Sequence, residues 1–207
     1  MKPIEKIMRA TPVIPVLVIE EVAHAAPVAA ALVAGGLKVL EVTLRTPAAL
    51  QAIREMARIE GAIVGAGTVL NERDVEASQA VGAKFIVSPG LTQSVVKAAA
   101  RQQLPILPGI ANASDLMRGL DLGLHHFKFF PAESLGGVGM LKALSAPFGQ
   151  CLFCPTGGIR LETALSWLAL KPVLCVGGSW LVPAGKPDVA AIEQRARAAA
   201  ALGKDRE

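Results

Sequence analysis

One lysine differs from the rest because it lies within an apolar run. The segment His126-Phe-Lys-Phe-Phe130 is typical of a buried strand, and alternation places Lys128 on the face opposite its two phenylalanine neighbours. Apolar surroundings disfavour the ammonium form, so the free amine becomes available to attack a ketone. The resulting imine withdraws electrons from the neighbouring carbon–carbon bond. Lys128 is therefore a candidate for covalent catalysis, with a lysine that extends to solvent as the structural alternative.

A carboxylate occupies a second unusual position. Residues 39–45 read Val-Leu-Glu-Val-Thr-Leu-Arg, and alternation puts Glu41, Thr43 and Arg45 on one face. The aliphatic side chains take the other face, which is suited to packing beneath helices. A buried carboxylate is costly unless it is paired, hydrated or functional. Two interpretations follow, a residue that transfers protons and a structural ion pair between Glu41 and Arg45.

Two glycine-rich segments near the end of the chain could bind an anion. Thr156-Gly-Gly158 follows one apolar run and Gly177-Gly-Ser179 follows the next. Bare glycine backbone lets amide N–H groups approach an anion. In a barrel of eight strands, the loops after the last two strands are the usual phosphate position. Paired glycines that serve as simple turns are the structural alternative.

These residues need a scaffold, and the sequence predicts one. Apolar runs alternate eight times with alanine-rich stretches of helical spacing, which predicts an α/β fold, a (β/α)₈ TIM barrel with an extra N-terminal helix over residues 1–10. A single domain over residues 1–207 is expected, and a doubly wound open sheet is the alternative. Strands are expected at residues 13–19, 38–43, 62–66, 85–88, 105–109, 126–130, 151–156 and 173–177, and helices at 21–34, 47–59, 71–81, 92–102, 113–122, 138–145, 161–169 and 188–201.

Local signals mark several helix ends. Thr46, Asn71 and Ser114 are expected to cap helices through their side-chain oxygens. Gly82 and Gly123 stand where helices should end in a left-handed residue.

Composition excludes several classes of protein. Of the 207 residues, 52% are hydrophobic and 18% charged, which excludes intrinsic disorder. The net charge of +4 is mild and its basic residues are not clustered, so no nucleic-acid partner is expected. No apolar run is long enough to span a membrane, and the first residues lack the apolar segment of a signal peptide. We expect a cytoplasmic protein without a membrane partner.

The three cysteines are expected to be free and buried in the core. Cys151 and Cys154 have the spacing of a redox motif, but strand alternation sends their thiols to opposite faces. A second pair that would complete a zinc site is missing. We therefore predict no metal and no cofactor.

Six segments, taken in order from residue 13 to about 183, carry a family resemblance. The chain resembles the KDPG/KHG aldolases, a family of class I aldolases named for 2-keto-3-deoxy-6-phosphogluconate. The matching segments are Glu41-Val-Thr-Leu-Arg-Thr46, Gly65-Ala-Gly-Thr-Val69, Ser88-Pro-Gly-Leu91, Phe127-Lys-Phe-Phe-Pro-Ala-Glu133, Phe153-Cys-Pro-Thr-Gly-Gly-Ile159 and Gly177-Gly-Ser-Trp180.

The resemblance implies a metal-independent lyase, normally a homotrimer, whose partners are a phosphorylated keto acid and pyruvate. Lys128 would form the imine and Glu41 would be the general acid/base. The other matched residues would bind substrate: Arg45 and Thr68 its carboxylate end, Pro89 and Phe130 the walls, Thr156, Gly157 and Gly158 its oxygens, and Gly178 and Ser179 the phosphate.

The substrate is less well defined than the chemistry. Cleavage of the phosphorylated acid to pyruvate and D-glyceraldehyde 3-phosphate is the main expectation. The alternatives are 4-hydroxy-2-oxoglutarate, the galactonate epimer, and a non-catalytic barrel that binds phosphorylated metabolites. The sequence departs from the family pattern at Leu135 and at Gly139-Met140, where specificity could differ.

Overall fold

The computed structural model describes residues 1–203, so the last four residues of the expected 1–207 domain lie outside it. Every strand is short, and most strand residues are apolar. The strands are β1 (Val13–Leu17), β2 (Val39–Thr43), β3 (Ile63–Gly67), β4 (Ile86–Ser88), β5 (Ile106–Ile110), β6 (His126–Phe129), β7 (Leu152–Pro155) and β8 (Val176–Gly178). The helices are α1 (Pro3–Arg9), the 3₁₀ turn η1 (Val22–His24), α2 (Ala25–Ala34), α3 (Ala49–Met56), α4 (Glu72–Ala80), α5 (Gln93–Arg101), α6 (Ala113–Asp121), α7 (Gly137–Ser145), α8 (Leu161–Leu168) and α9 (Val189–Ala201).

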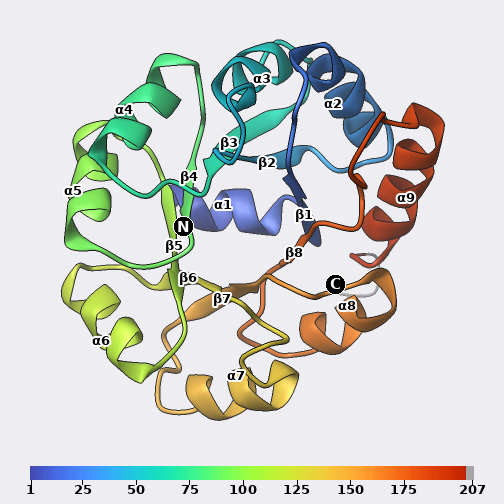
Figure 1. Ribbon diagram of the computed structural model, residues 1–207. Coiled ribbons are helices and arrows are strands. Elements are labelled where there is room, and N and C mark those ends of the chain that lie inside the picture. The colour runs from blue at the N-terminus through green and yellow to red at the C-terminus, as the bar shows by residue number, and fades with distance from the viewer. Residues whose placement is uncertain (204–207) are drawn as a thin grey trace.

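The strands form one parallel sheet in the order β7-β6-β5-β4-β3-β2-β1-β8. Its two edge strands meet through the bridges Phe153–Val173 and Thr156–Gly177, which close the sheet into a barrel. Helices surround the barrel, as Figure 1 shows. The expected (β/α)₈ barrel with an additional N-terminal helix is confirmed, and the doubly wound open sheet is excluded.

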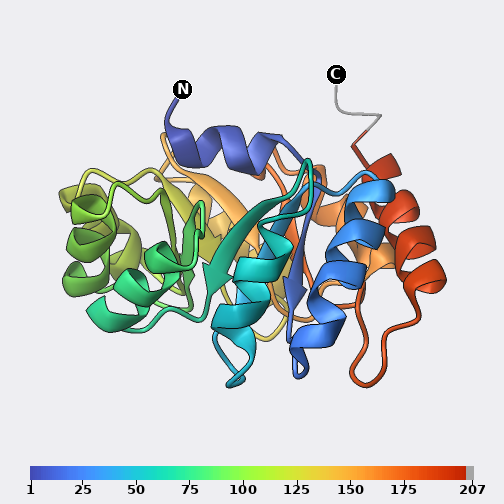
Figure 2. The same cartoon turned by 90° about the horizontal axis from the view of Figure 1, so that it is seen from above.

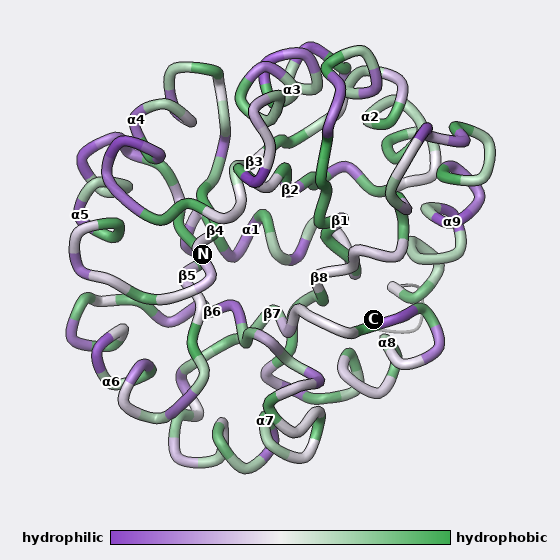
Figure 3. The backbone as a smooth tube through the Cα atoms, viewed as in Figure 1, coloured by the Kyte–Doolittle hydropathy of each residue, from purple (hydrophilic) through white to green (hydrophobic). Residues whose placement is uncertain are grey.

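Strand alternation divides the apolar residues into two layers. Phe127 and Phe129 of β6 point outward and pack in the large layer beneath the helices. Phe85 and Leu107 point inward and fill the barrel. The tube in Figure 3 accordingly shows hydrophobic strands inside a ring of helices that carry hydrophilic segments. No helix in residues 1–203 combines the length and apolar character needed to cross a membrane.

The cysteines follow the same division. Cys151 belongs to the outer layer and Cys154 to the barrel interior, so the two thiols lie on opposite faces, as alternation predicts. All three cysteines are buried. Burial raises the pKa of the Cys151 thiol, which keeps it protonated and unreactive. These cysteines pack as small apolar side chains.

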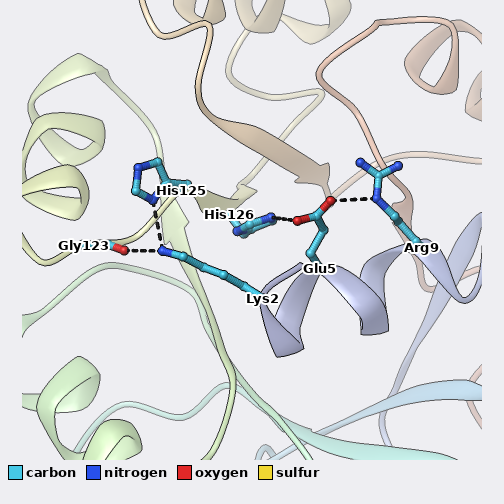
Figure 4. A network of polar contacts seen from close by, with 6 residues as sticks. All are labelled: Lys2, Glu5, Arg9, Gly123, His125 and His126. Atoms are coloured by element: carbon cyan, nitrogen blue, oxygen red, sulfur yellow. Dashed lines mark hydrogen bonds and ion pairs between the residues drawn. The ribbon is translucent and has the colours of Figure 1, made fainter.

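Helix α1 covers the N-terminal end of the barrel (Figure 2). It buries Ile4 and Met8 against the inner layer. Its polar side chains reach neighbouring segments in the network drawn in Figure 4. Arg9 donates to Glu5 at 2.8 Å, and the other Glu5 oxygen lies 3.4 Å from Nε2 of His126 in β6. The N-terminal end of the barrel is therefore closed by the apolar packing of α1 and by the polar contacts of Glu5.

The helix caps differ from the sequence expectation at two places. Asn71 caps α4 as expected, because its side chain accepts from the Asp74 N–H at 3.0 Å. Thr46 does not cap α3: its hydroxyl donates to the Ile19 carbonyl at 2.5 Å. The expected cap at Ser114 is also wrong, because Asn112, two residues earlier, caps α6.

Candidate active site

A cavity of about 410 Å³ lies at the C-terminal end of the strands, opposite α1. Except for Gly178, each site residue predicted from the sequence lies on its wall. The wall is formed by Val16, Glu41, Thr43, Arg45, Thr68, Pro89, Lys128, Phe130, Thr156, Gly157, Gly158, Ile159, Gly177 and Ser179. The site prediction had not included Val16, Thr43, Ile159 or Gly177. Of these, Thr43 shares the inward face of β2 with Glu41 and could have been found by alternation.

Lys128 and Glu41 meet inside this cavity. Nζ of Lys128 donates to Oε1 of Glu41 at 3.0 Å, and the two residues are 6% and 3% exposed. The Lys128 ammonium also lies 5.3 Å from the centre of the Phe130 ring. The lysine does not extend to solvent. Glu41 forms its ion pair with Lys128 rather than with Arg45, which corrects the structural alternative considered for Glu41.

A glycine on the neighbouring strand makes room for the Glu41 carboxylate. Gly67 of β3 pairs with Thr43 of β2, and a Cβ at Gly67 would overlap the carboxylate of Glu41. The carboxylate therefore lies across the backbone of β3, where an alanine would displace it. Gly67 thus fixes where the Glu41 carboxylate sits relative to Lys128.

Threonines and an arginine complete the side of the cavity around β2. The Thr43 hydroxyl donates to the Leu17 carbonyl at 2.8 Å and joins β1 to β2. Thr68 follows β3 with φ 57°, a left-handed conformation that is costly for a β-branched residue and is often found at functional sites. Arg45 is exposed at the cavity mouth, where its guanidinium can reach an entering carboxylate.

The glycine segments line the side of the cavity near β7 and β8. Gly157 and Gly158 have φ of 108° and 79°, values that glycine adopts readily. A Cβ at Gly177 would overlap the Thr156 side chain. Gly178 does not line this cavity, and a Cβ at Gly178 would overlap the Trp180 ring.

Ser179 stands between two cavities. It lines the cavity that contains Lys128 and also a smaller one of about 210 Å³. Val16 is shared as well. A ligand bound near Lys128 can therefore extend as far as Ser179.

Comparisons with known proteins agree with this geometry. The family model for KDPG and KHG aldolase matches residues 4–195. The chain is 57% identical over 202 residues to a 2-dehydro-3-deoxy-phosphogluconate aldolase of Zymomonas mobilis, covering 98% of this chain and 97% of the relative. A crystal structure of the Zymomonas mobilis aldolase with 3-phosphoglycerate superposes with a TM-score of 0.96, covering 98% and 97% of the two chains at 57% identity.

Two further relatives are informative. A KHG/KDPG aldolase of Escherichia coli is 55% identical over 181 residues, covering 87% of this chain and 85% of the relative. The Legionella pneumophila KDPG aldolase is 44% identical with a TM-score of 0.92, covering 97% and 98% of the two chains. Its crystal structure holds pyruvate captured at low pH as a covalent carbinolamine intermediate.

The structure combines a (β/α)₈ barrel with a buried lysine–carboxylate pair at the C-terminal end of the strands, the end at which barrel enzymes have their active sites. With these relatives beside it, the protein is an aldolase, a carbon–carbon lyase. The chain belongs to the KDPG and KHG aldolase family.

Proposed function

We propose that the protein cleaves 2-dehydro-3-deoxy-6-phosphogluconate to pyruvate and D-glyceraldehyde 3-phosphate through an imine on Lys128. The observation that carries this proposal is the 3.0 Å contact between Nζ of Lys128 and Glu41 inside the cavity. A nucleophile within hydrogen-bond reach of its base is the arrangement that amine catalysis needs. The carbinolamine captured in the Legionella pneumophila relative supports the same chemistry.

The reaction begins at the amine. Nζ of Lys128 adds to the C2 ketone, and Glu41 moves the protons by which the carbinolamine loses water to become an iminium ion. Glu41 then takes the proton of the C4 hydroxyl. The C3–C4 bond breaks, its electron pair flows into the iminium, and the aldehyde leaves. The enamine takes a proton at C3, and water hydrolyses the imine to release pyruvate and the free amine.

The cavity wall offers a partner for each end of the substrate. Arg45 and Thr68, on the side near β2 and β3, would bind the keto-acid carboxylate. Pro89 and Phe130 would form the walls beside the reacting carbons. Across the cavity, we assign the distal oxygens and the phosphate to the polar and glycine residues that follow β7 and β8: Thr156, Gly157, Gly158 and Ser179.

Trapping tests the imine directly. Incubation with pyruvate and sodium borohydride should add a reduced three-carbon group to Lys128, detected by peptide mass spectrometry. Lys128→Arg should abolish both the adduct and cleavage, because a guanidinium is not a nucleophile at neutral pH. A wild-type protein that forms no adduct, or a Lys128→Arg variant that cleaves normally, would refute the proposal. A non-catalytic metabolite-binding barrel predicts the first of these results.

A second substrate, 4-hydroxy-2-oxoglutarate, is favoured by the Escherichia coli relative, whose name includes KHG. This acid lacks a phosphate, so it needs no contact with Ser179. We expect Ser179→Ala to lower kcat/KM for the phosphorylated acid and to leave that for 4-hydroxy-2-oxoglutarate unchanged. Equal losses on both substrates would contradict the phosphate assignment. Running the galactonate epimer in the same assay measures the preference at C4.

We also propose that the protein is a homotrimer in the cytoplasm. The family resemblance supports this assembly. Large apolar side chains on two outer helices, Met117 on α6 and Leu165 on α8, are 59% and 52% exposed and would be covered by a neighbouring subunit. Sedimentation equilibrium should give three times the 21.5 kDa of one chain. A monomeric mass would refute the trimer.

A further inference from the structure

A buried tryptophan connects the lysine strand to the glycine segment after β7. Trp167 of α8 is fully buried, and its ring centre lies 6.2 Å from that of Phe129 in β6. Its indole N–H donates to Oε1 of Glu133 at 3.0 Å. Glu133 follows β6, five residues after Lys128 in the chain. One carboxylate therefore joins the lysine strand to the helix that follows the glycine segment.

The same residue also contacts the glycine segment directly. The Glu133 N–H donates to the Gly157 carbonyl at 3.0 Å, beside a parallel bond of 2.8 Å from the Ala132 N–H to the Thr156 carbonyl. A Cβ at Gly158 would lie 2.8 Å from both Cβ and Cγ of Glu133. The Glu133 side chain thus lies against Gly158, with its backbone bonded on one side and its carboxylate held on the other.

The second carboxylate oxygen of Glu133, Oε2, lies in an electrostatically favourable position. A Cβ at Gly137 would lie 3.5 Å from Oε2 of Glu133, so this oxygen faces the first residue of α7. A negative charge near a helix N-terminus is favourable. The Glu133 carboxylate therefore lies beside the start of α7 and accepts its hydrogen bond from α8; the residue is exposed and does not line the cavity.

We propose that Glu133 is a positioning residue that fixes the segment 156–158 relative to Lys128. Two successive glycines with positive φ have many alternative conformations, and the clamp selects one of them. Because Gly157 and Gly158 line the side of the cavity assigned to the distal oxygens, this selection sets the fit of the phosphorylated end of the substrate. This inference rests on the proposed function. It adds Glu133 as a residue that acts on the substrate only through the segment 156–158.

The test compares two substrates across matched variants. Glu133→Ala and Trp167→Phe each remove the hydrogen bond, and each should raise KM for the phosphorylated acid about five- to tenfold, the effect of one hydrogen bond. The kcat/KM for 4-hydroxy-2-oxoglutarate should stay within about twofold of wild type, since neither Glu133 nor Trp167 lines the cavity. Glu133→Gln retains an acceptor oxygen and should rescue KM. The double variant Glu133→Ala/Trp167→Phe should be no worse than either single variant.

Controls separate positioning from loss of structure. Glu162→Ala removes an exposed carboxylate from the first turn of α8 and should leave KM for both substrates unchanged. Equal losses on both substrates in Glu133→Ala and Trp167→Phe, or no loss at all, would overturn the inference. Borohydride trapping of pyruvate on Lys128 is run on every variant. Absent trapping in wild type refutes the proposed function, whereas intact trapping with unchanged KM refutes the role of Glu133 alone.

Discussion

Lys128 and Glu41 form a buried ion pair, and such pairs seldom add to the stability of a fold. Removing two charges from water costs several kcal/mol, and their attraction seldom returns more than that. An apolar pair of similar volume would fill the space as well. Residues that weaken the fold and yet sit together in a cavity are the ones expected to do chemistry. The free-energy cost of burying the Lys128–Glu41 ion pair is therefore an argument that the pair takes part in the reaction.

Replacing the pair should separate stability from activity. Lys128→Met leaves the Glu41 charge buried without its partner, so the free energy of unfolding should fall by about 3 kcal/mol. Lys128→Met/Glu41→Leu should restore or exceed wild-type stability and remain inactive. Urea denaturation at neutral pH measures both. A double variant less stable than the single one would show that the pair supports the fold.

Adding a side chain at Gly67 should lower kcat. In Gly67→Ala the new methyl group displaces the Glu41 carboxylate, and a shift of about 1 Å lowers kcat by about 100-fold. The measurement is steady-state kinetics on the phosphorylated acid. Gly149→Ala is the control, because a Cβ there meets no atom within 4 Å. A Gly67→Ala enzyme with full kcat would show that Glu41 is not held in place by this contact.

At the scale of elements, α1 and β6 meet at the closed end of the barrel through His126. Burial lowers the pKa of His126, while Glu5 raises it and Lys2 and His125 lower it further. The contact from His126 to Glu5 is 3.4 Å long, and Nε2 has no hydrogen-bond partner within residues 1–203. The imidazole is therefore neutral in the fold at neutral pH. Protonation would place a charge inside the packed base of the barrel.

The stability of the protein should consequently fall below pH 6.5. The folded-state pKa of His126 is lowered, so the unfolded chain takes up its proton first as the pH drops, and unfolding becomes easier. The pKa of Glu5 is also lowered, by its hydrogen bond to Arg9, but a carboxyl affects stability only in its own range below 4.5. Urea denaturation at pH 7.5 and 5.5 should therefore show a loss that His126→Gln reduces.

The matched control for this prediction lies at the other end of the barrel. His24 ends η1, after the first strand, and is half-buried beside the smaller cavity. His24→Gln should keep the pH dependence of the wild type. If His126→Gln keeps the full pH dependence as well, the titration belongs to another group.

The sequence predicts features that depend on neighbouring residues better than those that depend on residues far apart in the chain. Alternation correctly placed Lys128 and Glu41 inside the barrel, because a face is a local property of a strand. The cap at Thr46 was wrong because its hydroxyl bonds to Ile19, a carbonyl 27 residues away. The partner of Glu41 lies 87 residues away, and no local pattern identifies it. Glu133 is exposed, and only the folded structure shows that its carboxylate accepts a hydrogen bond from Trp167, 34 residues away.

At the scale of the whole molecule, closure of the barrel connects stability to the site. Thr156 and Gly177 form the bridge between β7 and β8, and both line the cavity. The sequence predicts the eight alternating units but cannot show which edges meet, because closure depends on the tilt and stagger of all the strands. One of the residues that join the two edges, Thr156, is thus also proposed to meet the substrate.

Two glycine-to-alanine substitutions should have opposite effects on stability. Gly177→Ala forces the Thr156 side chain to move at the closure, so the free energy of unfolding should fall by about 1–3 kcal/mol. Gly139→Ala lies within α7, where a Cβ meets no atom within 4 Å, and should raise it by up to about 1 kcal/mol. Thermal and urea unfolding give both values. Equal effects would show that the closure tolerates a side chain.

Helix α1, which covers one end of the barrel, also restricts the path by which substrate and products can move. With Ile4 and Met8 sealing the base, substrate enters and products depart by the same mouth. In the proposed mechanism the three-carbon acid is still bonded to Lys128 after bond cleavage, so it cannot leave until the imine is hydrolysed. The aldehyde must therefore leave first, and added pyruvate should compete with the substrate for the empty enzyme. The fixed order of product release follows from the covalent bond to Lys128, and the closed base of the barrel leaves both products the same exit.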